Sequence, residues 1–274
     1  MSLSRRLPRR AVLGLLAAEA AVAAAILSRG RANEAAPSQP GPTPPPPPSS
    51  SPAPTTIRLT DGRTVELLVL DPGSTLPGRI TTELDGAVAA VTEFWGDDWR
   101  RQITIVTTGT DEEFQALAAG RQEFAAATTV DRIVFAPGAA KMGPGALRIV
   151  LRHELFHYAS RPVTAADAPW CLTEGVADYV SRPRTPRPAP ADMAVLPGNA
   201  DFQVTGPALS LAYDRAWWFA RFVGGQFGDP VLRRLYLAAC GVDHPDLDTA
   251  LAATLGMDRD ALTAAWQRWL AAPG

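Results

Sequence analysis

The stretch that decides the fold is ALRIVLRHELFHYAS, residues 146–160, an apolar run with helical spacing. It holds two of the three histidines of the 274-residue chain, His153 and His157. Positions four apart share one face of an α-helix, so both imidazoles can reach the same metal ion. Glu154 stands directly after the first histidine and flanks the same ion. The run therefore predicts a helix that carries a metal site.

The spacing His-Glu-x-x-His is typical of zinc metallopeptidases, in which the histidines bind zinc and the glutamate serves as general base. The alternative is an ordinary surface or core helix that happens to carry two histidines. We prefer the zinc site because the chain is so poor in histidine. A third ligand must then come from another part of the chain.

Glu174 is the best candidate for that third ligand. A metzincin pattern would need Gly at 160 and His at 163, where the chain has Ser160 and Val163. His244 lies in a polar turn and is predicted to be a surface residue. A carboxylate from Glu174 would complete a two-histidine, one-glutamate set and leave the fourth position to water. Asp178, one helical turn later, could accept an N–H from a ligand histidine and fix its tautomer. Taken alone, the two acids could equally be solvated residues of an amphipathic helix.

The periodicity predicts an α+β fold, with a small mixed sheet before the motif helix and helices after it. Strands are expected at 64–70, 102–108, 123–130 and 132–136, and helices at 79–95 and 111–118. Gly143-Pro144-Gly145 begins the motif helix and Arg161-Pro162 ends it. A helix at 169–181 and an irregular Pro-rich segment at 182–206 follow. Further helices are expected at 207–227, 230–240, 246–255 and 258–271.

The N-terminal part differs in composition from the rest. Residues 1–36 combine arginines with an apolar run at 11–27 and are predicted to be an export signal or a signal anchor, with a loose twin-arginine character. Residues 37–56 are a Pro-rich linker, which favours extended polyproline II. We therefore expect an extracytoplasmic domain at 57–274, either secreted or held at the membrane through 11–27. Its lobes would be 57–160 (α/β) and 161–274 (helical).

The net charge of −2 gives no reason to expect a nucleic-acid partner. The two cysteines, Cys171 and Cys240, lack C-x-x-C spacing, so a thiolate zinc site is not expected. For an exported domain, a Cys171–Cys240 disulfide and two buried free thiols are equally good predictions.

The segment HELFH, followed by PWCLTEGVADY at 169–179, resembles the gluzincins, the thermolysin-like or peptidase MA-like zinc metallopeptidases. LAYDRAWWFARFVGGQFG (211–228) and WQRWL (266–270) are similar to the helical lobe of that group. The resemblance covers roughly 79–271. It implies a zincin-like fold: a twisted sheet, the motif helix, a glutamate helix and a helical lobe, with the substrate between the lobes.

The resemblance also implies roles for single residues. Three positions match the zinc ligands of the family: His153, His157 and Glu174. Glu154 matches its catalytic base, and Asp178 matches the acid that orients a ligand. Tyr213 matches a tyrosine or histidine that stabilises the oxyanion, whereas Tyr158 and Tyr179 are expected to be core tyrosines. Cys171 departs from the family pattern. As a free thiol it could compete for zinc, and as a disulfide partner it could brace the glutamate helix; we favour a structural role.

The function expected from this resemblance is exported, Zn²⁺-dependent hydrolysis of a peptide or protein substrate. The substrate would add to the sheet edge before the motif helix, at 123–130, where Ala125, Ala126 and Ala127 leave room for its side chains. Two alternatives remain open: a non-catalytic envelope binding or scaffolding domain, and a zinc amidase that acts on a cell-wall peptide.

Overall fold

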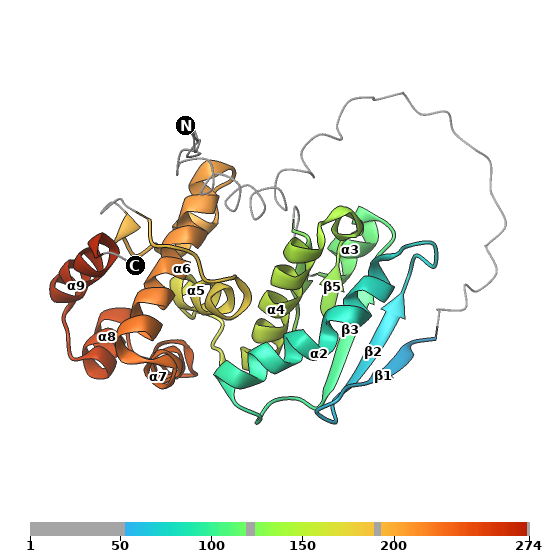
Figure 1. The fold of residues 1–274 in the computed structure, drawn as a ribbon, viewed down its shortest axis with the longest axis horizontal. Helices are drawn as coiled ribbons and strands as arrows, with labels where there is room; N and C mark the ends of the chain where they lie inside the picture. The colour runs from blue at the N-terminus through green and yellow to red at the C-terminus, as the bar shows by residue number, and fades with distance from the viewer. Residues whose placement is uncertain (1–52, 119–123, 189–192, 273–274) are drawn as a thin grey trace, which may run out of the picture.

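The computed structural model describes residues 53–118, 124–188 and 193–272. Figure 1 shows a small sheet at one end, a group of helices at the other, and the motif helix between them. The predicted signal at 1–36 lies outside the described residues, as does the linker up to residue 52. In the part of the chain that is described, no helix combines the length and the apolar character needed to cross a membrane.

The sheet has five strands in the order β1-β2-β3-β5-β4. The three inner strands are parallel to one another, whereas the outer strands β1 and β4 are antiparallel to their neighbours. Their bounds are β1 (Thr55–Arg58), β2 (Thr64–Val69), β3 (Gln102–Thr107), β4 (Ala126–Thr128) and β5 (Ile133–Phe135). Among the described residues, β4 therefore forms one edge of the sheet.

Side-chain alternation along the strands places helices on both faces of the sheet. In β3, Ile103 and Ile105 join the main core, which α2 (Leu76–Trp95) and α4 (Pro144–Ser160) cover. Val106 points to the other face and packs in a smaller core with Phe114 of α3 (Asp111–Leu117). The sheet is thus the middle layer of three at this end of the molecule.

The motif helix α4 is held by its apolar face. Pro144 occupies its first turn, where the missing N–H removes no hydrogen bond. Leu147, Leu151 and Leu155 are fully buried in the main core. Their spacing leaves the two motif histidines, which are only partly buried, on a different face of the helix. A short 3-10 turn, η2 (Pro137–Lys141), precedes α4, and another, η3 (Arg161–Val163), follows it.

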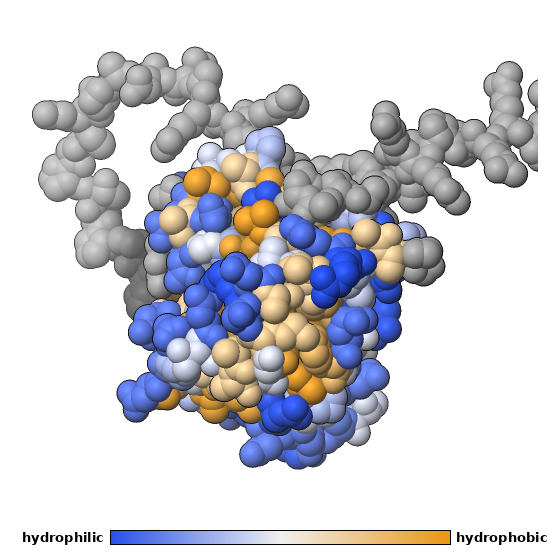
Figure 2. Space-filling view, turned by 90° about the vertical axis from the view of Figure 1, so that its left-hand side faces the viewer, coloured by the Kyte–Doolittle hydropathy of each residue, from blue (hydrophilic) through white to orange (hydrophobic). Residues whose placement is uncertain are grey.

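The other end of the molecule is helical. Its helices are α5 (Trp170–Ser181), α6 (Pro207–Phe227), α7 (Asp229–Cys240), α8 (Leu247–Leu255) and α9 (Arg259–Ala271). Aromatic rings link α6 to α9, with Phe219 and Trp266 in edge-on contact at 5.3 Å between centroids. On the outer face of this end, Figure 2 shows apolar residues through the middle and hydrophilic residues around them.

The expected elements are confirmed, but the sequence did not predict β1, and the strand expected at 123–130 is shorter than predicted. β1 begins at Thr55, two residues inside the predicted linker, because Thr55 and Thr56 pair with Leu67 and Glu66 of β2. The strand predicted at 123–130 is limited to Ala126–Thr128, since Thr129 already bonds back to Arg132 in the turn to β5. The Pro-rich segment 182–206 also contains a 3-10 turn, η5 (Asn199–Phe202).

Gly175 allows α5 and α6 to lie very close together. A Cβ at this position would be 2.5 Å from the carbonyl oxygen of Ala216 in α6. The obstacle is backbone, so no side-chain rotation can relieve it. Because Gly175 directly follows Glu174, this contact also sets the position of the helix turn that carries the predicted third ligand.

We therefore expect Gly175→Ala to destabilise the protein by about 1–3 kcal/mol through overpacking. The matched control is Gly86→Ala in α2, where an added Cβ meets nothing within 4 Å. That change should stabilise the protein by up to about 1 kcal/mol through helix propensity. Urea unfolding of both variants measures the difference, and equal stability of the two would contradict the close contact.

Candidate active site

Three predicted ligands come together between α4 and α5. His153 and His157 belong to α4, and Glu174 belongs to α5. Nε2 of His153 lies 3.0 Å from Nε2 of His157 and 3.2 Å from Oε2 of Glu174. Nε2 of His157 lies 3.5 Å from the same carboxylate oxygen. The three donor atoms thus form a nearly regular triangle.

This triangle is close to the size that a tetrahedral zinc ion requires, and two of its edges are slightly shorter. Zinc binds histidine nitrogen and carboxylate oxygen at about 2.0–2.2 Å, which places two ligands about 3.3–3.6 Å apart. The observed edges run from 3.0 to 3.5 Å. The side chains are 15, 20 and 17% exposed, so the site is sheltered but reached by solvent on one side. A fourth ligand such as water can enter from there.

The charges around the donors favour a cation. Burial by itself would raise the pKa of Glu174, but the two imidazoles outweigh it and hold this pKa well below its usual range. Burial also disfavours a charged His153, yet Asp178 and Glu174 raise its pKa well above the ordinary value. A positive charge at this point is therefore stabilised by the surrounding carboxylates.

Asp178 orients the first histidine. Its Oδ1 lies 3.0 Å from Nδ1 of His153, and its side chain is only 5% exposed. A carboxylate here accepts the Nδ1–H and leaves Nε2, the atom of the donor triangle, with its lone pair free for a metal. The structure thus places Asp178 where the sequence prediction needs it.

Two further residues extend this contact away from the site. Nη2 of Arg182 lies 2.6 Å from Oδ2 of Asp178, and its Nη1 donates to Oδ1 of Asp214 in α6 at 2.8 Å. Burial lowers the pKa of Arg182, but the two carboxylates outweigh burial and raise it. Sequence reasoning missed both residues. The spacing of Asp178 and Arg182, one helical turn apart, was the available signal; nothing local points to Asp214.

Glu154 lies on the sheet side of the motif helix. It is buried, and its Oε2 accepts a hydrogen bond of 2.7 Å from the hydroxyl of Thr128 in β4. Thr128 is a second residue that sequence reasoning missed. Its pairing with Glu154 depends on how the edge strand packs against α4, which no local sequence pattern reveals.

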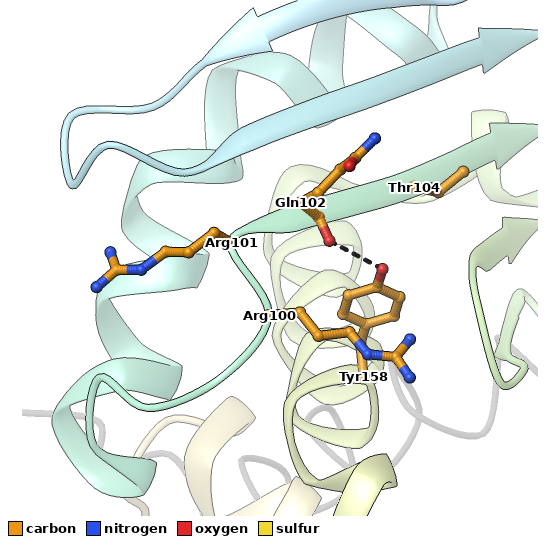
Figure 3. Close-up of a pocket in the computed structure, with 5 residues that line it drawn as sticks. All are labelled: Arg100, Arg101, Gln102, Thr104 and Tyr158. Atoms are coloured by element: carbon orange, nitrogen blue, oxygen red, sulfur yellow. Dashed lines mark hydrogen bonds between the residues drawn. The ribbon is translucent and has the colours of Figure 1, made fainter.

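The tyrosines differ in their surroundings. The hydroxyl of Tyr158 donates to the carbonyl of Gln102 at 3.0 Å, and Arg100 lies over its ring (Figure 3). The pocket in that view is lined by Arg100, Arg101, Gln102, Thr104 and Tyr158, none of which is a predicted ligand. Tyr179 donates to Asp229 at 2.6 Å, and burial and this carboxylate raise its pKa to about 12. Both therefore act as packing residues, as expected.

Tyr213 lies in α6, directly before Asp214. Its half-buried ring packs edge-on against Phe202, with 5.3 Å between the centroids. The role of its hydroxyl toward an oxyanion stays a prediction.

His244 is not the surface residue that we expected. Its side chain is 12% exposed, its Nδ1 donates to the carbonyl of Pro245 at 2.7 Å, and its Nε2 lies 3.5 Å from Asp167. The polar turn folds back onto the protein and covers the imidazole. Among the described residues, His244 does not belong to the donor group formed by the three predicted ligands.

Both cysteines are free and buried, which settles the open choice in favour of thiols. Cys171 lies in α5 and Cys240 at the end of α7, and neither belongs to the donor group found within the described ranges. Burial raises the pKa of Cys171 to about 12 and also raises that of Cys240. A protonated, buried thiol is a poor zinc ligand and a poor nucleophile.

Comparisons with known proteins leave the family open. No family model matches the chain, and neither does any curated protein. Among solved structures, the chain is similar to a mutant of an M1 zinc metallopeptidase from Deinococcus radiodurans, with a TM-score of 0.45 and 16% identity over 80% of this chain. A two-domain M1 zinc metallopeptidase bound to L-arginine gives a TM-score of 0.44, also with 16% identity over 80% of this chain. The chain covers 51% of each of these chains, about half their length. Because this similarity is too low to assign a family, the function has to be argued from the site itself.

We expect Asp178→Asn to weaken zinc binding about 10- to 100-fold, because a neutral amide is a weaker acceptor for the Nδ1–H of His153 and can also turn its NH2 group toward this nitrogen. Competition with a fluorescent zinc chelator measures the change. Asp260→Asn, which alters an exposed acid in the first turn of α9, is the control and should bind zinc normally. Unchanged affinity in Asp178→Asn would contradict the orienting role.

The thiols should resist alkylation in the folded protein. At pH 8.5 we expect iodoacetamide to add no group to native protein, because both thiols are buried and stay protonated. In guanidinium chloride without reductant, intact mass should show both cysteines labelled. Labelling of the denatured chain only after reduction would instead demonstrate a disulfide.

Proposed function

We propose that the protein is a zinc-dependent metallopeptidase of the gluzincin type. The observation that carries this proposal is the triangle of donor atoms, with edges of 3.0, 3.2 and 3.5 Å, set beside a buried glutamate on the same helix. A purely structural histidine pair does not need one carboxylate oxygen within 3.5 Å of both rings. An open fourth position next to a glutamate is the arrangement of a hydrolytic zinc site.

His153, His157 and Glu174 would hold the zinc ion. When bound, zinc polarises the scissile carbonyl and lowers the pKa of a coordinated water to about 7. Glu154 would accept the proton of the attacking water and deliver it to the leaving amine. Asp178 and Arg182 keep His153 in the tautomer that leaves Nε2 available. Tyr213 is the proposed donor to the oxyanion, a contribution of about 3 kcal/mol for one donor.

The proposed substrate is a peptide that pairs with β4, the outermost strand of the sheet among the described residues. This strand packs directly against α4, and its Ala126 and Ala127 are small. A peptide in extended conformation along β4 would therefore pass close to Glu154. Export through the N-terminal segment, with the domain secreted or anchored outside the cytoplasm, is part of the proposal and follows from the sequence of 1–36 alone.

The decisive experiment separates zinc binding from hydrolysis. Glu154→Gln should bind one zinc per chain and lose peptide hydrolysis by at least about 100-fold, since general base catalysis is removed. Glu174→Ala should lose zinc, because two histidines remain as ligands. Mass spectrometry of the metal and of a mixed decapeptide library, with and without chelator, measures both properties. Glu93→Gln, an exposed change in α2, is the control.

The same measurements test the rival functions. Full activity of Glu154→Gln would overturn the proposed mechanism. A domain that binds zinc but cleaves no peptide of the library would favour the scaffolding function, and chelator would then leave partner binding unchanged. Release of fragments only from cell-wall peptides would favour the amidase.

A further inference from the structure

We infer that Thr128 is a positioning residue for the catalytic base, and that it links this base to the strand edge on which a peptide would pair. The inference rests on the proposed function. The hydroxyl of Thr128 lies 2.7 Å from Oε2 of Glu154 and 2.9 Å from the backbone carbonyl of the same residue. One side chain of the sheet thus contacts both the carboxylate and the helix turn that carries it.

The geometry of this contact restricts the carboxylate of Glu154. A glutamate has three rotatable side-chain bonds, and this one is 8% exposed. A hydrogen bond to one oxygen fixes the plane of the carboxylate and leaves the other oxygen free to accept a proton. The contact with the helix carbonyl also holds β4 at a fixed distance from α4. Such restriction of a general base is worth a large factor in rate, because misplacement by about 1 Å costs about 100-fold.

The backbone N–H and C=O groups of Thr128 point away from β5. The residues on either side of β4 bond to the residues that flank β5. The N–H of Ala136 donates to the carbonyl of Ala125, and the N–H of Thr129 donates to the carbonyl of Arg132. Bonded and non-bonded residues alternate along an antiparallel pair, so the backbone groups of Ala126 and Thr128 point away from β5, toward the outer edge of the described sheet. A peptide added to this edge would bond to Thr128 itself, whose side chain bonds to Glu154.

The side chains of the strand support this arrangement. Ala126 packs in the main core on the side of α4, whereas Ala127 packs in the smaller core on the side of α3. Thr128, two residues after Ala126, shares the α4 face by alternation. The hydroxyl therefore reaches Glu154 without any distortion of the strand, and a valine at this position would occupy the same space.

The experiment compares Thr128→Val, Thr128→Ser and Thr129→Val in the zinc-loaded full chain. The probe is the decapeptide that the wild type cleaves fastest in the library, synthesised singly. We expect Thr128→Val to lower kcat at least 10-fold, with KM changed less than twofold and one zinc per chain retained. Thr128→Ser should restore kcat to within threefold of the wild type. Thr129→Val removes a neighbouring hydroxyl that bonds to Asp131 in the turn, and should keep kcat.

Two double variants make the inference independent of general damage. In a Glu154→Gln background, Thr128→Val should cause no further loss of kcat, because the base it positions is gone. In thermal unfolding, the loss of Tm in Thr128→Val/Glu154→Ala should be smaller than the sum of the two single losses. This comparison of Tm values measures the interaction between Thr128 and Glu154 and requires no hydrolysis.

Two kinetic results would overturn the inference: wild-type kcat in Thr128→Val, or a loss of kcat that Thr128→Ser fails to restore. A strictly additive loss of Tm would show that the two side chains do not interact, and would overturn it as well. A wild-type chain that binds zinc but cleaves nothing would instead overturn the proposed function, and with it the role of Thr128, even if the Tm cycle shows the contact.

Discussion

Three electron-pair donors held within 3.0–3.5 Å of one another are the constraint on which the rest of the structure depends. Imidazole nitrogens and a carboxylate oxygen at this distance repel unless a proton or a metal ion lies between them. The raised pKa of His153 favours such a proton, which makes its contact with Glu174 an attraction. Packing fixes the two helices that carry the donors: α4 through its buried leucine face, and α5 through the close approach of Gly175 to Ala216 of α6.

A chain of ion pairs from Asp178 through Arg182 to Asp214 connects His153 to the helical end of the molecule. Asp178 is nearly inaccessible to solvent, so removing its partner would leave a buried charge without compensation, which typically costs 3–5 kcal/mol. Arg182 provides that partner and at the same time reaches Asp214 of α6. The orientation of a ligand in α4 therefore depends on the packing of α6, although α6 contributes none of the three donors.

Helical periodicity explains why the grouping of the candidate ligands could be predicted and that of their supporting residues could not. His153 and His157, like Glu174 and Asp178, are four residues apart, and a helix places such pairs on one face wherever it packs. The supporting residues lie far from their partners in the sequence. Thr128 precedes Glu154 by 26 residues, and Asp214 follows Arg182 by 32 residues. Their roles depend on strand and helix packing, which has no local pattern. The same limit applies to the tyrosines, because the hydroxyls of Tyr158 and Tyr179 bond to Gln102 and Asp229, which are far from them in the sequence.

The sheet and the helical end thus act on α4 from opposite sides. The donors, with Asp178 and Arg182, are supported by α5 and α6, whereas Glu154 is held by Thr128 of β4. Under the proposed function, metal binding and proton transfer would depend on two different packing contacts of one helix. A change on the sheet side can alter the base and leave the ligands intact, and a change on the helical side can do the reverse. Under the proposed function, β4 is the point where a bound chain would meet this division, because β4 is an edge strand among the described residues and its Thr128 contacts Glu154.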